Sequence, residues 1–166
     1  MRAEQESSEV GWGYSRDETE AQKLDRNWNE LLQEIRVLQT GSQILAAFLI
    51  VLPFQSRFDQ LDQFQIYLYL GLLLLALVIV ALLLTPVGIH RRLFRQRVKD
   101  EMVRIANRLL MAAIVLLALL LTGVAVFVVD VVLGRVEAAV IGALLATLLV
   151  ILLVVVPWTM PKRSIS

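Results

Sequence analysis

Four long stretches of this chain contain no charged side chain, and they constrain its fold more than any other feature. These stretches are residues 37–56, 63–90, 109–129 and 138–161, and all of the 16 Lys and Arg and 15 Asp and Glu residues lie between or outside them. A helix needs about 20 predominantly apolar residues to cross about 30 Å of hydrocarbon. The pattern therefore predicts transmembrane spans at about residues 37–54, 65–86, 109–129 and 137–157.

The apolar content is too high for an ordinary water-soluble core. Hydrophobic residues make up 58% of the chain, whereas soluble domains contain about 45–50%. The runs 72–75, 78–84 and 148–156 are apolar on every face of a helix, and a soluble bundle would need a polar face there. The expected fold is an all-α, integral membrane four-helix bundle, and residues 37–166 form its transmembrane domain.

The first 36 residues are of a different kind. Residues 1–22 are acidic and nearly free of aliphatic side chains, which predicts a disordered tail. Residues 23–36 have apolar side chains at helical spacing, Trp28 and Ile35 among them, and predict an amphipathic helix. This helix is expected to lie on the cytoplasmic surface or to run straight into the first span. No basic, apolar secretory signal precedes it, so the N-terminus is expected to stay in the cytoplasm.

Basic residues predict the orientation. The loop between the second and third spans carries seven Lys or Arg, whereas the other two loops carry one each, Arg57 and Arg135. Short loops rich in Lys and Arg stay on the cytoplasmic side. We therefore expect an inner (plasma) membrane protein with both termini in the cytoplasm. Tyr67 and Tyr69 would then lie in an outer aromatic belt, and Pro86 and Gly88 would mark a kink or break at the inner end of the second span.

A polar stripe at the start of the first span is one candidate functional feature. Arg36, Gln39, Thr40 and Gln43 follow one another at spacings of three and four, so they share a helix face. Amides are costly in hydrocarbon unless they are hydrogen-bonded, so this face should look into the bundle, a water pocket or another subunit. It is either part of a polar pathway or, in the preferred interpretation, a set of interhelical hydrogen bonds.

Asp130 is a second candidate, because it is the deepest acid on the outer side. If the third span continues to Leu133, Asp130 lies at the membrane edge and could bind a cation or a proton. The simpler interpretation, which we prefer, is a helix-end residue paired with Arg135.

Two further sets of residues predict contacts rather than chemistry. Basic residues of the middle loop are expected to set the topology and to contact anionic lipid head groups; they include Arg91, Arg92, Arg95, Arg97 and Lys99. Ala138, Gly142 and Ala146 are four residues apart on the last span, which favours a close helix–helix contact, within the subunit or between subunits.

The chain has no cysteine and one histidine, so thiolate metal sites and disulfides are excluded. It also lacks a phosphate-binding glycine loop, a nucleophile–base constellation and an acid pair within a span. We therefore expect no enzyme activity, no cofactor, no metal and no nucleic acid.

Three stretches resemble a known family. Residues 26–45 (RNWNELLQEIRVLQTGSQIL), 52–58 (LPFQSRF) and 85–96 (TPVGIHRRLFRQ) are similar to an uncharacterised family of small actinobacterial membrane proteins, a domain of unknown function. The resemblance covers about residues 24 to 130 and implies a four-span layout. Some members of that family have been labelled sodium:proton antiporters, although antiporters of that kind are larger and use acids deep in broken helices.

Two functions remain after these arguments. The preferred one is a non-enzymatic accessory, scaffold or assembly subunit in the membrane. The alternative is an oligomeric transporter of ions or small solutes, with Arg36, Gln39, Gln43 and Asp130 along its path. The expected partners are the bilayer, anionic lipid head groups, and either further copies of the chain or a larger membrane complex.

Overall fold

The computed structural model describes residues 20–93 and 99–159, and every regular element in these ranges is a helix. The long helices are α1 (Glu20–Val51), α2 (Gln63–Leu93), α3 (Lys99–Val132) and α4 (Arg135–Val150). The 3-10 turns η1 (Leu52–Phe54) and η2 (Phe58–Gln60) connect α1 to α2, and α4 continues through a π-helical turn, η3 (Ile151–Val155), into α5 (Val156–Thr159). Within the described residues, four helical segments are long and apolar enough to cross a membrane: Arg26–Phe54, Gln63–Pro86, Arg104–Val132 and Arg135–Thr159.

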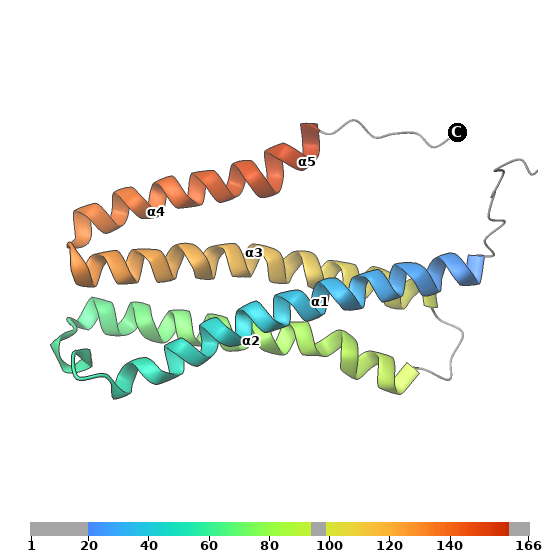
Figure 1. Cartoon of the computed structure of the whole chain (residues 1–166), viewed down its shortest axis with the longest axis horizontal. Coiled ribbons are helices and arrows are strands. Elements are labelled where there is room, and N and C mark those ends of the chain that lie inside the picture. Colours follow the sequence, from blue (N-terminus) through green and yellow to red (C-terminus); the bar gives the residue numbers. More distant parts are fainter. Residues whose placement is uncertain (1–19, 94–98, 160–166) are drawn as a thin grey trace, which may run out of the picture.

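The helices do not form a closed bundle of four. In the described part of the chain α1, α2 and α3 contact one another, whereas α4 contacts only α3 among the long helices. Figure 1 shows α4 on the far side of α3 from α1 and α2. The core therefore lies among α1, α2 and α3, and α4 is an added layer.

Buried side chains recur at alternating spacings of three and four. On α2 the buried positions are Tyr69, Leu72, Ala76, Ile79, Leu83 and Pro86. On α1 they include Trp28, Ile35, Ser42 and Leu49, each seven residues after the last. This is the spacing at which helices pack along a shallow left-handed crossing, with side chains of one helix entering gaps in the next.

The helix predicted at 23–36 runs straight into the segment predicted as the first span at 37–54, which is one of the two arrangements expected from the sequence. A single helix, α1, runs through both segments without interruption. No proline occurs between Glu20 and Val51, so nothing breaks the backbone hydrogen bonds until Pro53. α1 also begins at Glu20, inside the segment 1–22 predicted to be disordered, while residues 1–19 lie outside the described residues.

Of the kink or break predicted at Pro86 and Gly88, the break does not occur, because α2 continues to Leu93. A further expectation needs correction. Tyr69 does not belong to an outer aromatic belt, because its side chain is buried between helices, whereas Tyr67 is exposed. The π-helical turn η3 ends two residues before Pro157, which has no N–H to offer the carbonyl four residues earlier.

Candidate functional site

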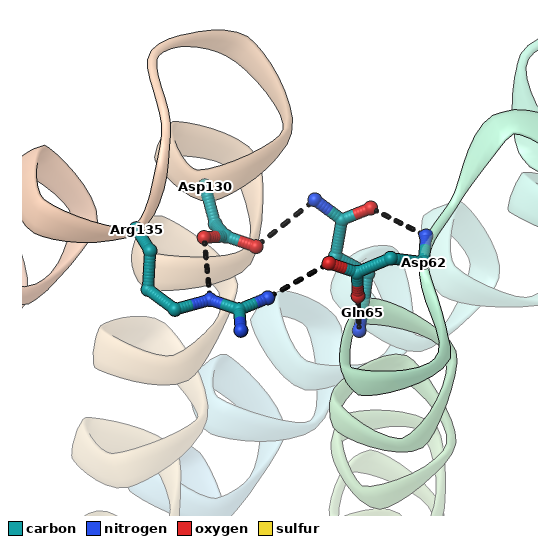
Figure 2. Close-up of polar contacts among 4 residues, drawn as sticks. All are labelled: Asp62, Gln65, Asp130 and Arg135. Carbon is teal, nitrogen blue, oxygen red and sulfur yellow. Dashed lines mark hydrogen bonds and ion pairs between the residues drawn. The ribbon is translucent and has the colours of Figure 1, made fainter.

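A cluster of four polar side chains joins three helices at the end of the molecule that holds the α1–α2 and α3–α4 loops. Figure 2 shows Asp62, Gln65, Asp130 and Arg135 pointing toward one another. The Gln65 amide nitrogen donates to Asp130 Oδ2 at 2.9 Å, and Arg135 Nε lies 3.5 Å from Asp130 Oδ1. The Arg135 guanidinium also donates to Asp62 Oδ2 at 2.8 Å. The cluster therefore connects the start of α2, the end of α3 and the start of α4.

Local sequence positions two of these side chains. Asp62 precedes the first residue of α2, and its Oδ1 accepts a hydrogen bond from the Gln65 backbone N–H at 2.8 Å. The Gln65 side-chain oxygen accepts one in return from the Asp62 backbone N–H at 3.0 Å. This reciprocal pair is a capping box, which satisfies two backbone donors at a helix start. It also fixes the Gln65 side chain so that its NH2 group faces Asp130.

The tight connection between α3 and α4 positions the other two. Gly134 has a φ of 120°, a conformation that residues with a Cβ rarely adopt. It lets the chain reverse within two residues of the end of α3. As a result Arg135, the first residue of α4, lies beside Asp130 in the last turn of α3.

The electrostatics of Asp130 explain why it needs these partners. Its side chain is only 2% exposed, and a carboxylate at a helix C-terminus is disfavoured by the helix dipole. The Gln65 amide and the Arg135 guanidinium supply one partner to each carboxylate oxygen. Arg135 also stacks over Phe64, with 4.2 Å from the guanidinium carbon to the ring centroid. Two carboxylates and one guanidinium give this cluster a formal charge of −1.

The polar stripe of α1 does not face the bundle. The side chains of Arg36, Thr40 and Gln43 are exposed, and only Gln39 turns toward α2. Thr40 uses its hydroxyl within α1, donating to the Arg36 carbonyl at 3.0 Å. The fully buried polar side chain of this helix is Ser42, which the sequence argument missed, and its hydroxyl donates to the Gln39 carbonyl.

Two polar contacts between α1 and α2 lie next to prolines. Pro53 has no N–H, so the Leu49 carbonyl lacks its usual donor four residues later, and the Tyr69 hydroxyl donates to it at 3.0 Å. The second contact differs, because Pro86 removes the donor of the Leu82 carbonyl, whereas the Gln39 amide donates to the neighbouring Leu83 carbonyl at 3.1 Å. The Tyr69 hydroxyl thus replaces the donor that Pro53 lacks, in the way that side chains of neighbouring helices satisfy backbone groups freed by a proline.

The small residues of α4 lie against α3. Ala138 and Gly142 are buried, and Ala146 is partly buried. A Cβ at Gly142 would lie 2.4 Å from Val126 Cγ2, so only glycine fits without rearrangement. Here the stripe makes a contact within the subunit.

The structure describes no side-chain position for the five basic residues that were predicted to contact lipid head groups. Arg95 and Arg97 lie outside the described residues, and for Arg91, Arg92 and Lys99 the structure describes the backbone alone.

The structure does not bring the two candidate polar features together. Gln65 and Leu83, which mark the Asp130 cluster and the Gln39 contact, are 18 residues apart on α2, or about 27 Å along the helix axis at 1.5 Å per residue. Among the described residues, the buried polar or charged side chains are Ser42, beside the Gln39 contact, and Asp130, in the cluster. No group of three acidic, histidine or cysteine side chains that could hold a metal occurs in residues 20–93 and 99–159.

The fold places this chain in the class of small helical proteins whose four long helices are apolar enough to cross a membrane. Polar contacts join three of these helices at the end of the molecule that holds the α1–α2 and α3–α4 loops. Residues 17–157 match a family described as a family of unknown function, DUF6328, and the chain belongs to that family. The predicted resemblance to a family of unknown function is thereby confirmed, while the match says nothing of an actinobacterial origin or an antiporter label. Searches of curated proteins and of solved structures found no match.

Proposed function

We propose that this protein is a four-span inner-membrane protein with a non-enzymatic scaffold or assembly role, both termini facing the cytoplasm. Its four apolar helices fit the bilayer in length and composition. The orientation is supported by the seven Lys and Arg residues between the second and third spans. Those residues would also bind anionic lipid head groups, each contributing about 1 kcal/mol near the membrane surface.

The paired state of Asp130 is the observation that favours a scaffold. A carrier group must release its protein partners to take up an ion, whereas both Asp130 oxygens are engaged by Gln65 and Arg135. The interior between this cluster and the Gln39 contact is packed with apolar side chains, Leu72, Ala76 and Ile79 among them. A closely packed apolar interior of this kind favours a rigid structural protein over a path for ions.

A transporter is the second candidate because one observation favours it. Asp130 is a buried carboxylate inside a segment long enough to span the membrane, and such groups mark ion sites in many transporters. The net negative charge of its cluster would attract a cation. The path would also include the polar residues of α1.

Purification of the full chain from native membranes in mild detergent tests the scaffold role. We expect a larger membrane protein to be recovered in a fixed ratio, identified by cross-linking and mass spectrometry. Recovery of the chain without such a partner would contradict this role.

A flux assay tests the alternative. Proteoliposomes containing the wild type or Asp130→Asn would be given a sodium or pH gradient, with an internal pH dye as the readout. Asp59→Asn is the matched control, because Asp59 is an exposed acid of the α1–α2 loop outside the cluster. The scaffold proposal predicts no protein-dependent flux, and flux that Asp130→Asn abolishes while Asp59→Asn preserves would overturn it.

A further inference from the structure

A second regular row of side chains runs along the exposed side of α1, separate from the buried row that packs on α2 and α3, and its member Gln33 borders a groove between α1 and α3. Its members follow at spacings of four and three, and all are exposed: Asn29, Gln33, Arg36, Thr40, Gln43 and Ala47. We call this row the outer seam. It repeats the spacing by which the helices of this molecule pack on one another, but its side chains are polar or small.

Gln43 makes the outer seam unusual in a membrane helix. It lies seven residues beyond Arg36, inside the uncharged stretch 37–56, which places it about 10 Å deeper along the helix axis. In the described part of the chain no group hydrogen-bonds to its amide, and its side chain is exposed. An amide facing hydrocarbon without a partner is costly, so we expect a polar group beyond the described helices to meet it.

The other helices of the subunit do not cover this face. α2 and α3 contact α1 along the row of Ile35, Ser42 and Leu49. α4 packs on α3 and makes no contact with α1 among the described residues. The helices of the described ranges therefore leave this face of α1 open to another chain.

We propose that the outer seam packs against the outer seam of a second copy, so that two α1 helices run parallel about a two-fold axis normal to the membrane. A carboxamide both donates and accepts hydrogen bonds, so two Gln43 side chains at the same depth satisfy each other. The Thr40 hydroxyl donates to the Arg36 carbonyl of its own helix, and the Ala47 side chain is small. The backbones of the two α1 helices can therefore approach each other on either side of Gln43. The two Arg36 side chains lie at the membrane boundary, where their length lets them diverge into the head groups.

Single-cysteine cross-linking of the full chain in its membrane tests this pairing, and the absence of native cysteine makes each product unambiguous. Thr40→Cys and Ala47→Cys place thiols on the outer seam. Gly41→Cys and Phe48→Cys are matched controls, because both positions are exposed on α1 but lie on another face. We expect oxidation to give a dimer of twice 18.7 kDa from the seam positions and several-fold less from the controls. Equal yields at all four positions, or a product containing a different protein, would overturn the proposal.

The amide itself is tested in the Thr40→Cys background. Gln43→Leu should lower the dimer yield by about tenfold, whereas Gln43→Asn, which keeps an amide, should retain most of it. Because Gln43 is exposed, neither change disturbs the core. An unchanged yield with leucine would refute the role of Gln43.

The pairing rests on the proposed membrane setting but not on the scaffold role. Each variant is therefore extracted with alkaline carbonate before analysis. A chain released from the membrane would contradict the proposed setting and the pairing together, whereas a chain that stays in the membrane without the seam pattern would contradict the pairing alone.

Discussion

At the scale of single residues, two buried hydrogen-bond acceptors of this protein are matched by donors from other helices. The Asp130 carboxylate meets Gln65 and Arg135, and the Leu49 carbonyl meets the Tyr69 hydroxyl. A buried acceptor that loses its donor costs more than the net value of the hydrogen bond, because nothing else solvates it. Loss of either donor should therefore destabilise the fold measurably.

Gln65→Leu should lower the free energy of unfolding in detergent by about 1–3 kcal/mol, because Asp130 Oδ2 and the Asp62 backbone N–H would both lose a partner. Gln63→Leu is the matched control, since that side chain is exposed and bonds only to the Tyr67 hydroxyl at 3.3 Å. The control should change the free energy by less than about 0.5 kcal/mol. Chemical denaturation followed by circular dichroism measures both, and equal effects would show that the Gln65–Asp130 contact does not stabilise the fold.

Tyr69→Phe should cost about 1–3 kcal/mol, because the Leu49 carbonyl would lose the donor that replaces the missing N–H of Pro53. In a Pro53→Ala background the backbone can supply that N–H, so the same change should cost less. A double-mutant cycle in the unfolding free energy measures the difference. Additive effects of the two substitutions would show that Tyr69 and Pro53 are not coupled.

At the scale of helices, close approach between α3 and α4 depends on small residues at their contact. Gly142 leaves room for Val126, and Ala138 is almost completely buried one turn earlier. Dispersion contacts replace the hydrophobic effect between helices in lipid, so any side chain that separates them weakens the contact.

Gly142→Leu should destabilise the packing of α4 by about 1–3 kcal/mol, because even its Cβ would overlap Val126. Val126→Ala should restore part of the loss. Ala143→Leu is the control, since Ala143 is exposed on the next position of the same helix. Thermal unfolding in detergent gives the comparison, and a loss as large for Ala143→Leu as for Gly142→Leu would argue against the contact.

At the scale of the whole molecule, the layout is open. Three helices share a core, and α4 rests on α3 alone among the long helices of the described ranges (Figure 1). Most of the apolar side chains of α4 are exposed. In a bilayer the apolar surface of α4 can contact lipid or a partner. The outer seam of α1 differs, because lipid tails offer no hydrogen bonds to its polar side chains.

The proposed orientation predicts the location of each loop. A reporter fused after Ser166 should read cytoplasmic, as should one inserted at residues 94–98, whereas one inserted after Gln60 should read periplasmic. The physical reason is the concentration of Lys and Arg between the second and third spans. A paired phosphatase and fluorescent-protein reporter measures this, and a periplasmic C-terminus would reverse the topology.

The sequence by itself determined the number of long apolar helices, their approximate ends and the small-residue spacing of α4, because these depend on composition and period within one segment. A sequence signal for the capping box was also present, an acid followed three residues later by a glutamine, Asp62 and Gln65, although its link to Asp130 was not. Only the tertiary structure decided which face of each helix is buried. It placed Tyr69 in the core, turned Gln43 outward and joined Asp130 to two other helices. The rotation of a helix about its axis is set by the packing of its side chains against segments far apart in the sequence. In a helix that is apolar on several faces, the sequence period does not reveal which of those faces the neighbouring helices cover.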